Sequence, residues 1–177
     1  MKREKKKWIK YSFRKYSKTY PQLFAQEKKE LKKVFRNAKI EHIGSTSIKG
    51  LGGKGIIDLA IFSKKSLSSI RPSLIKRGYE QWHVPKKRKF FSFERDLPDK
   101  KNPSKIFHIH LTSDEEVFMK MILFRDYLRE NPKVMKEYAK LKKHASKVSK
   151  NNAEKYKKIK NPFIKSIIKK AKKENKR

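Results

Sequence analysis

The segment that most constrains this chain is residues 42–58, HIGSTSIKGLGGKGIID, which joins two stretches with the character of β-strands. The stretch AKIEHIG leads into it, and the stretch KGIIDLAIF closes it and is apolar on both faces, which is typical of a buried strand. Four of the chain's six glycines follow Gly44 inside the segment. A loop of this kind presents backbone N–H groups and the hydroxyl of Ser45 to an anion. The sequence therefore predicts a phosphate-binding turn beside a buried strand.

The rest of the chain changes from a mixed pattern to a helical one. Residues 21–37 and 63–80 have the apolar spacing of helices. Short apolar runs over 79–112 are separated by turns rich in Pro, Asp, Asn and Lys, which favours antiparallel neighbours. From residue 113 onward the pattern is helical. We predict an α+β fold with flanking helices, a helical C-terminal part and one mixed β-sheet of strands at about 39–43, 56–62, 79–84, 90–95 and 106–112.

Local signals set the expected ends of the helices. Within the helical stretch 63–80, Gly78 suits the position just after the last helical residue. The order Ser-Asp-Glu-Glu predicts that Ser113 caps the next helix and that Glu116 completes a capping box. Pro162 predicts a kink or a split in the last helix.

Charge is concentrated toward the C-terminus. The net charge is +34, and residues 133–177 alone hold 18 Lys or Arg against three Glu. Such a charge attracts polyanions and repels itself. Nonspecific binding of RNA or DNA would account for it, and so would a lysine-rich proteome. We expect a single domain over residues 1–177, with an α/β core over 1–112 and a helical, strongly basic part over 113–177.

Several classes of protein are excluded by what the sequence lacks. Cysteine is absent, so neither disulfides nor thiolate metal sites can form. The basic N-terminal residues have no apolar core of a secretory signal, and no apolar run reaches the length of a membrane span. We therefore expect a cytoplasmic protein with no membrane partner.

A strand, Gly-Ser, a spacer of about a dozen residues and a second strand with Asp58 form a pattern that resembles the polymerase-β-like nucleotidyltransferase superfamily. It is not a Walker motif, because no Gly-Lys-Ser/Thr opens a helix. In that superfamily Gly-Ser holds the nucleotide triphosphate, and two carboxylates in an Asp-x-Asp/Glu arrangement, on one face of a strand, bind catalytic metal ions. Here Ala60 stands two residues after Asp58. The resemblance therefore implies the scaffold, with its usual chemistry impaired.

The segment 41–58 also resembles the signature of GrpB-family proteins, in which His-Ile-Gly-Ser-Thr precedes Pro-Gly-Leu and Ala-Lys-Pro-Ile-Ile-Asp. The resemblance continues through RGYE, RKFFSF, HIHL and LFRDYLRENPKVMKEYAKLKKHAS and covers nearly the whole chain. It implies a nucleotidyltransferase-like fold but no particular reaction. Lys49 replaces the family's proline and residues 52–55, Gly-Gly-Lys-Gly, replace its Ala-Lys-Pro, so we expect a looser loop.

The candidate catalytic residue is Asp58, and the candidate metal ligands are Asp58, His108 and His110, together with His42. His108 and His110 alternate on a strand and so share a face. Nitrogen and oxygen ligands of this kind suit a divalent ion such as Mg²⁺, Mn²⁺ or Zn²⁺. Alternatively, the histidines are hydrogen-bonded residues of a cleft wall, and Asp58 only ties the loop by accepting N–H bonds.

The candidate phosphate-binding residues are Gly44, Ser45, Thr46, Lys54 and Arg125. Each has a structural alternative. The two hydroxyls would satisfy amides of the loop, the lysine would be a solvated charge, and the arginine would pair with a neighbouring carboxylate.

Two functions remain open at this point. In the first, the protein binds a nucleotide or another phosphate-bearing ligand and transfers a nucleotidyl or phosphoryl group, with positioning and metal electrostatics carrying catalysis. In the second, it is a non-enzymatic RNA- or DNA-binding protein on the same scaffold, and lysines supply the affinity. Ala60 favours the second function, whereas Asp58 and the HIGST and HIH segments favour the first.

Overall fold

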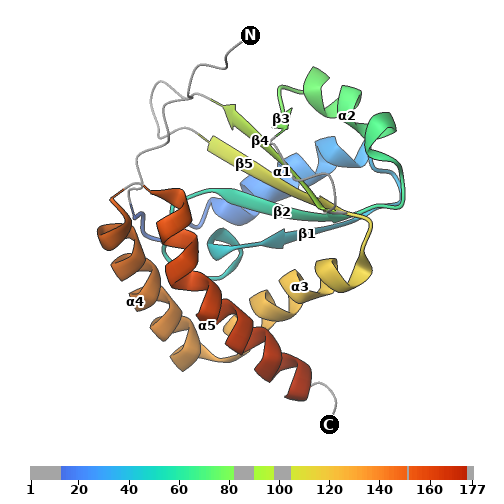
Figure 1. The fold of residues 1–177 in the computed structure, drawn as a ribbon. Coiled ribbons are helices and arrows are strands. Elements are labelled where there is room, and N and C mark those ends of the chain that lie inside the picture. Colours follow the sequence, from blue (N-terminus) through green and yellow to red (C-terminus); the bar gives the residue numbers. More distant parts are fainter. Residues whose placement is uncertain (1–12, 82–89, 98–104, 151, 175–177) are drawn as a thin grey trace.

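A computed structural model describes residues 13–81, 90–97, 105–150 and 152–174 (Figure 1). Within these ranges the chain forms one mixed sheet in the order β1-β2-β5-β4-β3. β2 and β5 are parallel, and the other neighbouring pairs are antiparallel. The strands are β1 (Lys39–Ile43), β2 (Ile57–Phe62), β3 (Glu80–Gln81), β4 (Phe90–Leu97) and β5 (Lys105–Thr112). The predicted α+β class with a mixed sheet is confirmed, and residues 82–84 of the third predicted strand lie outside the described ranges.

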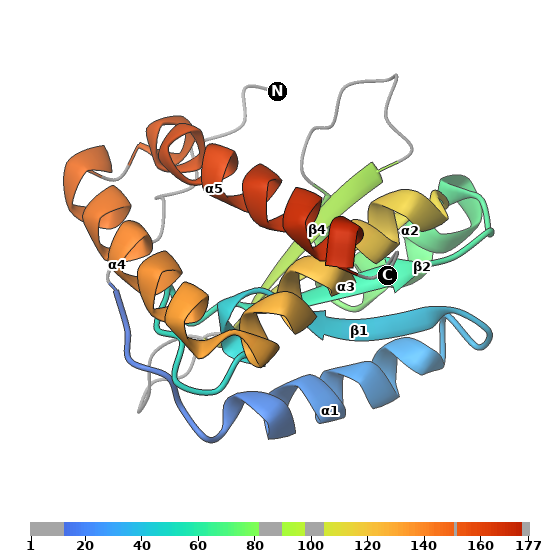
Figure 2. The same ribbon diagram turned by 90° about the horizontal axis from the view of Figure 1, so that it is seen from below.

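Helices cover both faces of this sheet. Figure 2 shows α1 on one side of β1 and α3 and α5 on the other. α3 contacts β1, β2 and β5, whereas α4 and α5 pack mainly on each other and on α3. None of the described helices is both long and apolar enough to cross a membrane. The helices are α1 (Tyr20–Lys32), α2 (Leu67–Lys76), α3 (Glu115–Glu130), α4 (Pro132–Ser149) and α5 (Ala153–Glu174).

Alternation along β2 divides its side chains between two cores. Leu59 and its neighbours at odd positions are buried with Leu31 of α1 and Leu74 of α2. Ala60 is fully buried on the other face, against Phe118 of α3. Because even-numbered residues of β2 face the C-terminal helices, Asp58 does so as well.

Two helices differ from the sequence predictions, α3 at its N-terminus and α5 at its proline. Asp114, not Ser113, caps α3, because its carboxylate accepts hydrogen bonds from the backbone N–H groups of Glu116 and Val117. α5 passes through Pro162 as one helix, so the predicted split is absent. Packing on both sides of the proline holds these residues together: Tyr156 precedes it and Ile167 follows it, and both are buried.

Close approaches of side chains explain two of the glycines between β1 and β2, Gly44 and Gly53. Gly44 has φ 70° and ψ −170°, a conformation that is essentially restricted to glycine. A Cβ atom there would lie 2.2 Å from Asp58 Oδ2. At Gly53 a Cβ atom would lie 2.3 Å from Ser45 Oγ and 2.6 Å from Lys142 Nζ. Gly44 and Gly53 let Asp58, Ser45 and Lys142 approach the loop backbone, so at these two positions the loop is closely packed and not looser as we expected.

Gly44→Ala is expected to lower the free energy of unfolding more than Gly50→Ala. Both residues have positive φ, which costs an alanine about 1–2 kcal/mol, but a Cβ atom at position 50 meets nothing within 4 Å. Only the first variant adds a collision with Asp58. Urea unfolding of the two variants measures the difference, and equal losses would show that Asp58 moves aside without cost.

Candidate functional site

A cavity of about 520 Å³ lies between the sheet and the helices α4 and α5. Pockets of roughly 300–1,000 Å³ are the usual size for small-molecule ligands. The loop between β1 and β2, the strands β2, β4 and β5, and both helices contribute to its wall. Among the lining residues are Gly44, Ser45, Lys54, Asp58, His108, His110, Tyr138, Lys142, Tyr156, Lys157 and Lys160.

Three of the predicted metal ligands meet in this cavity. Asp58 on β2 is the register partner of His108 on β5, and His110 follows two residues along β5 on the same face. One potential ligand atom from each of the three lies within 4.8 Å of the others. His110 Nε2 donates to Asp58 Oδ1 at 3.2 Å, and His108 Nδ1 lies 3.7 Å from the same oxygen. The parallel pairing of β2 and β5 therefore creates a cluster of two imidazoles and one carboxylate.

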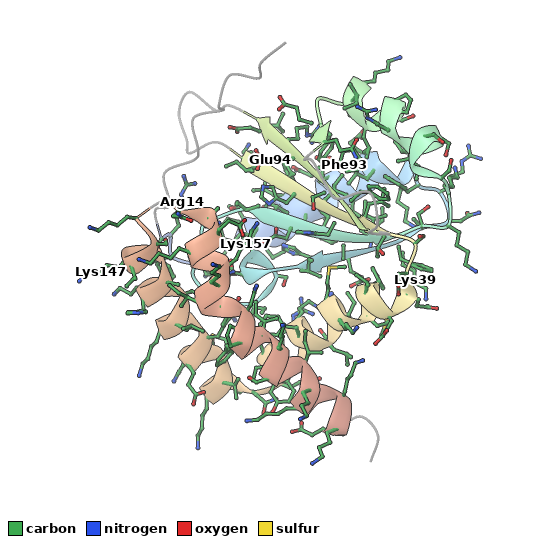
Figure 3. All side chains as sticks on the ribbon, viewed as in Figure 1. Arg14, Lys39, Phe93, Glu94, Lys147 and Lys157 are labelled. Atoms are coloured by element: carbon green, nitrogen blue, oxygen red, sulfur yellow. The ribbon has the colours of Figure 1, made fainter. Side chains whose placement is uncertain are left out.

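Glu94 on β4, which the sequence reasoning missed, lies next to this cluster and contacts His108 (Figure 3 labels Glu94). Glu94 pairs with His108 in the antiparallel ladder of β4 and β5, and only 7% of it is exposed. Its carboxylate accepts a hydrogen bond from His108 Nε2. The only signal in the sequence is an acidic residue inside the aromatic strand FFSFER. Its partner depends on strand register, which the sequence pattern did not reveal.

The environment keeps Asp58 ionised. Burial opposes its ionisation, but the hydrogen bond from His110 and the electrostatic interactions with His110, His108 and Lys160 outweigh that effect. The net result is a pKa of Asp58 below its ordinary value. A carboxylate, rather than a carboxylic acid, therefore faces the cavity at neutral pH.

Three partly or fully buried lysines share the cavity with Asp58. Burial is the main cause that lowers the pKa of Lys142 to about 7 and the pKa values of Lys54 and Lys160 to about 8; neighbouring ammonium groups act in the same direction and Asp58 opposes them. Lys142 Nζ donates to the carbonyl oxygen of Gly52 at 2.7 Å. The ammonium groups of Lys54 and Lys160 lie 4.7 and 4.4 Å from the ring centroid of Tyr156, within cation–π range. Such a gathering of cations suits a polyanionic ligand.

The structure does not bring His42 or Thr46 to this cavity. His42 has the parity of Ile40 on β1 and so lies on the α1 face, where its ring stacks on Phe24 with centroids 4.6 Å apart. Its Nε2 atom lies 3.0 Å from Thr46 Oγ1, and the Thr46 hydroxyl donates to the carbonyl oxygen of Ile56. Burial lowers the pKa of His42 to about 4. Both residues therefore stabilise the turn from behind, which corrects their assignment as metal and phosphate ligands.

Arg125 is also placed away from the cavity. Its guanidinium donates to Glu41 Oε2 at 2.7 Å and to Asp126, as the structural alternative predicted. It also donates to the carbonyl oxygen of His42. One turn further along α3, Arg129 donates to the carbonyl oxygen of Ser47 at 2.9 Å. The two arginines thus fasten α3 to the turn that carries Ser45, and Arg125 does not line the cavity.

Comparison with solved structures identifies the class of fold. The Cid1 poly(U) polymerase bound to MgATP matches with a TM-score of 0.50 and 16% identity, over 73% of this chain and 45% of that one. The GLD-2/RNP-8 complex matches with a TM-score of 0.51 and 16% identity, over 76% and 56%. At such identities the likeness concerns the fold alone. The fold is nucleotidyltransferase-like, as predicted.

The family follows from closer similarities. The family model described as GrpB protein matches residues 10–170, and the chain therefore belongs to the GrpB family. The crystal structure of the conserved protein GrpB from Enterococcus faecalis matches with a TM-score of 0.79 and 27% identity, covering 94% of this chain and all of that one.

Two curated relatives are similar in sequence. UPF0157 protein YqkA of Bacillus subtilis (strain 168) is 32% identical over 162 residues, which is 89% of this chain and 46% of YqkA. Glutamate-rich protein GrpB of Alkalihalophilus pseudofirmus is 30% identical over 162 residues, which is 86% of this chain and 91% of that protein. The chain thus spans less than half the length of YqkA.

Replacing Lys142 with methionine is expected to change how stability depends on pH. In the folded protein the pKa of Lys142 is about 7, against 10.5 for an ordinary lysine. Between these values the unfolded chain binds more protons, so this group makes the protein more stable as pH rises. From pH 7 to pH 10 the free energy of unfolding of the wild type should rise by on the order of 3 kcal/mol more than that of Lys142→Met.

Urea unfolding at the two pH values measures this difference. Lys136→Met removes an exposed lysine from the same helix and serves as the control. The loss of the hydrogen bond to Gly52 affects Lys142→Met at both pH values and cancels in the comparison. The same pH dependence in Lys142→Met and wild type would contradict a buried, easily deprotonated Lys142.

Proposed function

We propose that this GrpB-family protein binds a nucleotide or another phosphate-bearing ligand in the cavity between the sheet and α4 and α5, together with a divalent metal ion. One observation carries the proposal: Lys54, Lys142 and Lys160 share a single cavity with the cluster of Asp58, His108 and His110. Ammonium groups neutralise phosphate oxygens, and a divalent ion binds carboxylate oxygen and imidazole nitrogen, the two kinds of ligand in the cluster.

The donor atoms of the cluster fit such an ion. Asp58 is ionised, and its carboxylate lies within reach of a nitrogen from each of His108 and His110. A divalent ion held there would neutralise charge on a phosphate and make its phosphorus more electrophilic.

The other residues of the cavity would position the ligand. Lys54 and Lys160, fixed against the ring of Tyr156, are placed to meet phosphate oxygens. Ser45 adds a hydroxyl at the cavity wall. Lys142 holds the loop through Gly52, and residues of α4 and α5 form one wall of the cavity.

Nucleotidyl or phosphoryl transfer is the reaction class that this arrangement supports. A polymerase of the same fold, the Cid1 poly(U) polymerase, has been solved with MgATP bound. In this chain Ala60 occupies the position of the superfamily's second carboxylate, and it is fully buried. A site with one carboxylate would not hold two metal ions, so we propose that transfer is slow compared with that of two-metal enzymes.

Binding of a nucleoside triphosphate in the presence of Mn²⁺ tests this proposal by calorimetry. Lys160→Gln and Lys54→Gln should each weaken binding by about 10- to 100-fold, because each removes a charged hydrogen bond to phosphate. Lys158→Gln, on an exposed neighbour of Lys160, is the matched control and should leave binding unchanged. No binding by the wild type, or equal losses in Lys158→Gln and Lys160→Gln, would refute the proposal.

A second candidate function, nonspecific binding of RNA or DNA, is favoured by the outer faces of α4 and α5. Figure 3 shows Lys147 of α4 extending away from the rest of the chain. A row of phosphates could follow such a surface without entering the cavity. The exposed lysines of these helices include Lys133, Lys136, Lys140, Lys143, Lys147, Lys155, Lys158, Lys165, Lys169, Lys170 and Lys173.

A salt titration of duplex DNA binding tests this second function. Replacing Lys169, Lys170 and Lys173 with Gln should make the slope of log affinity against log salt shallower by about 0.9 for each lysine that contacts phosphate. Lys172 is kept because it pairs with Glu116.

A control variant with the same change in charge carries Gln at three exposed lysines elsewhere, Lys29, Lys64 and Lys76. Its slope should remain that of the wild type. Undetectable binding at low salt, or the same slope in both triple variants, would mean that the charge of α5 serves no nucleic acid.

A further inference from the structure

We propose that the metal centre of the cavity selects a borderline transition-metal ion of the Zn²⁺ type over Mg²⁺, and that Glu94 is its positioning residue, acting through His108. This inference rests on the proposed function, because it names the class of metal ion that would accompany the phosphate-bearing ligand. Three observations carry it: the identity of the donor atoms, the burial of Ala60, and the hydrogen bond between His108 and Glu94.

The donor atoms favour an ion softer than Mg²⁺. Mg²⁺ prefers oxygen ligands in octahedral geometry, whereas imidazole nitrogen suits Zn²⁺, Fe²⁺, Ni²⁺ and Cu²⁺. Asp58 supplies the only carboxylate of the three-residue cluster found among the described residues, and His108 and His110 supply nitrogen. Two nitrogens and one carboxylate oxygen form a donor set of the kind that binds zinc and non-haem iron.

The position from which a second oxygen ligand would come is closed. Ala60 is fully buried and packs with Ile43 and Phe118 on the face that points to α3. Its register partner on the neighbouring strand is His110. The strand pairing therefore places an imidazole beside the position at which the superfamily pattern has a carboxylate. The change from two carboxylates to one carboxylate and two imidazoles is a change of ligand chemistry, not only a loss of one ligand.

Glu94 sets the orientation of His108. Because His108 Nε2–H donates to Glu94, the remaining nitrogen, Nδ1, keeps its lone pair and lies 3.7 Å from Asp58 Oδ1. Carboxylate, imidazole and metal in this order recur in zinc proteins, where the outer carboxylate fixes the tautomer of the histidine and raises its basicity. Glu94 is 7% exposed, so water does not replace this interaction readily.

Three protein ligands leave a position for a ligand in the cavity. Structural zinc sites usually have four protein ligands, whereas catalytic ones have three and keep one position open. The lysines Lys54, Lys142 and Lys160 line the same cavity. A phosphate oxygen in the open position would therefore have the metal ion and the ammonium groups around it.

Calorimetric titration of the chelator-treated protein with Zn²⁺ and with Mg²⁺, each without nucleotide, tests the proposal. Zn²⁺ should bind at least about 100-fold more tightly than Mg²⁺, and His110→Ala should abolish the preference. Glu94→Gln should weaken Zn²⁺ binding by about 10- to 100-fold, the range seen for outer carboxylates of zinc sites. Glu80→Gln, which changes the exposed ladder partner of Glu94 on β3, is the matched control and should bind Zn²⁺ as the wild type does.

Two further measurements separate positioning from a general effect on folding. The melting temperature of the metal-free protein should be similar for Glu94→Gln and Glu80→Gln, while the increase in melting temperature on adding Zn²⁺ should be smaller for Glu94→Gln. Nitrogen chemical shifts of His108 in the wild type should report the tautomer with the proton on Nε2, and this holds as a test even if the Glu94 variant does not fold.

The outcomes distinguish this proposal from the proposed function. Tight Zn²⁺ binding that depends on Glu94 supports the metal centre even where no nucleotide binds. Nucleotide binding that is supported by Mg²⁺, in a protein whose affinity for Zn²⁺ is no higher, would overturn the metal centre and leave phosphate binding standing. An unchanged affinity for Zn²⁺ in Glu94→Gln, or a proton on Nδ1 of His108, would overturn the role of Glu94.

Discussion

The arrangement of the cavity depends on one buried contact, the hydrogen bond from Lys142 Nζ on α4 to the carbonyl oxygen of Gly52. A buried ammonium group is costly unless it is paired. Here it has the carbonyl oxygen, the ring of Tyr138 and the charge of Asp58 nearby. The contact is made possible by Gly53, since any side chain there would collide with Lys142. It ties α4 to the loop and so borders the space in which the other lysines face Asp58, His108 and His110.

Strand register is the second constraint, and it acts on the opposite wall. β2 and β5 lie side by side in parallel, which puts Asp58 next to His108, and β4 then adds Glu94 on the far side of that histidine. These three side chains come from segments far apart in the sequence, yet they form a continuous row across the sheet. In this row Glu94 orients the ring of His108 through Nε2, and Nδ1 faces Asp58. Rigid strands can hold such a geometry more accurately than loops can.

Much of the wall that the sheet forms could be predicted from the sequence, because the alternation of side chains along a strand is a local property. It placed His108 and His110 on one face and identified the strands that carry them and Asp58. The same alternation, applied to Ile40, would have put His42 on the buried α1 face, so that error was avoidable. Glu94 was not predictable in this way, because its partner depends on the pairing of β4 with β5. Lys142 could not be distinguished from the exposed lysines of a charge run without knowing which face of α4 packs on the loop.

The charges of the lysines and of the strand residues act on each other across the cavity. Lys54, Lys142 and Lys160 gather around one ionised carboxylate, and their pKa values lie well below that of an ordinary lysine because burial and mutual repulsion both disfavour their charge. A divalent ion on Asp58, His108 and His110 would add still more positive charge to this space. Such an arrangement is unfavourable when it is empty and becomes favourable when several negative charges enter it. Turning these lysines inward therefore carries an electrostatic cost, and a multiply charged anion would offset that cost more fully than a singly charged one.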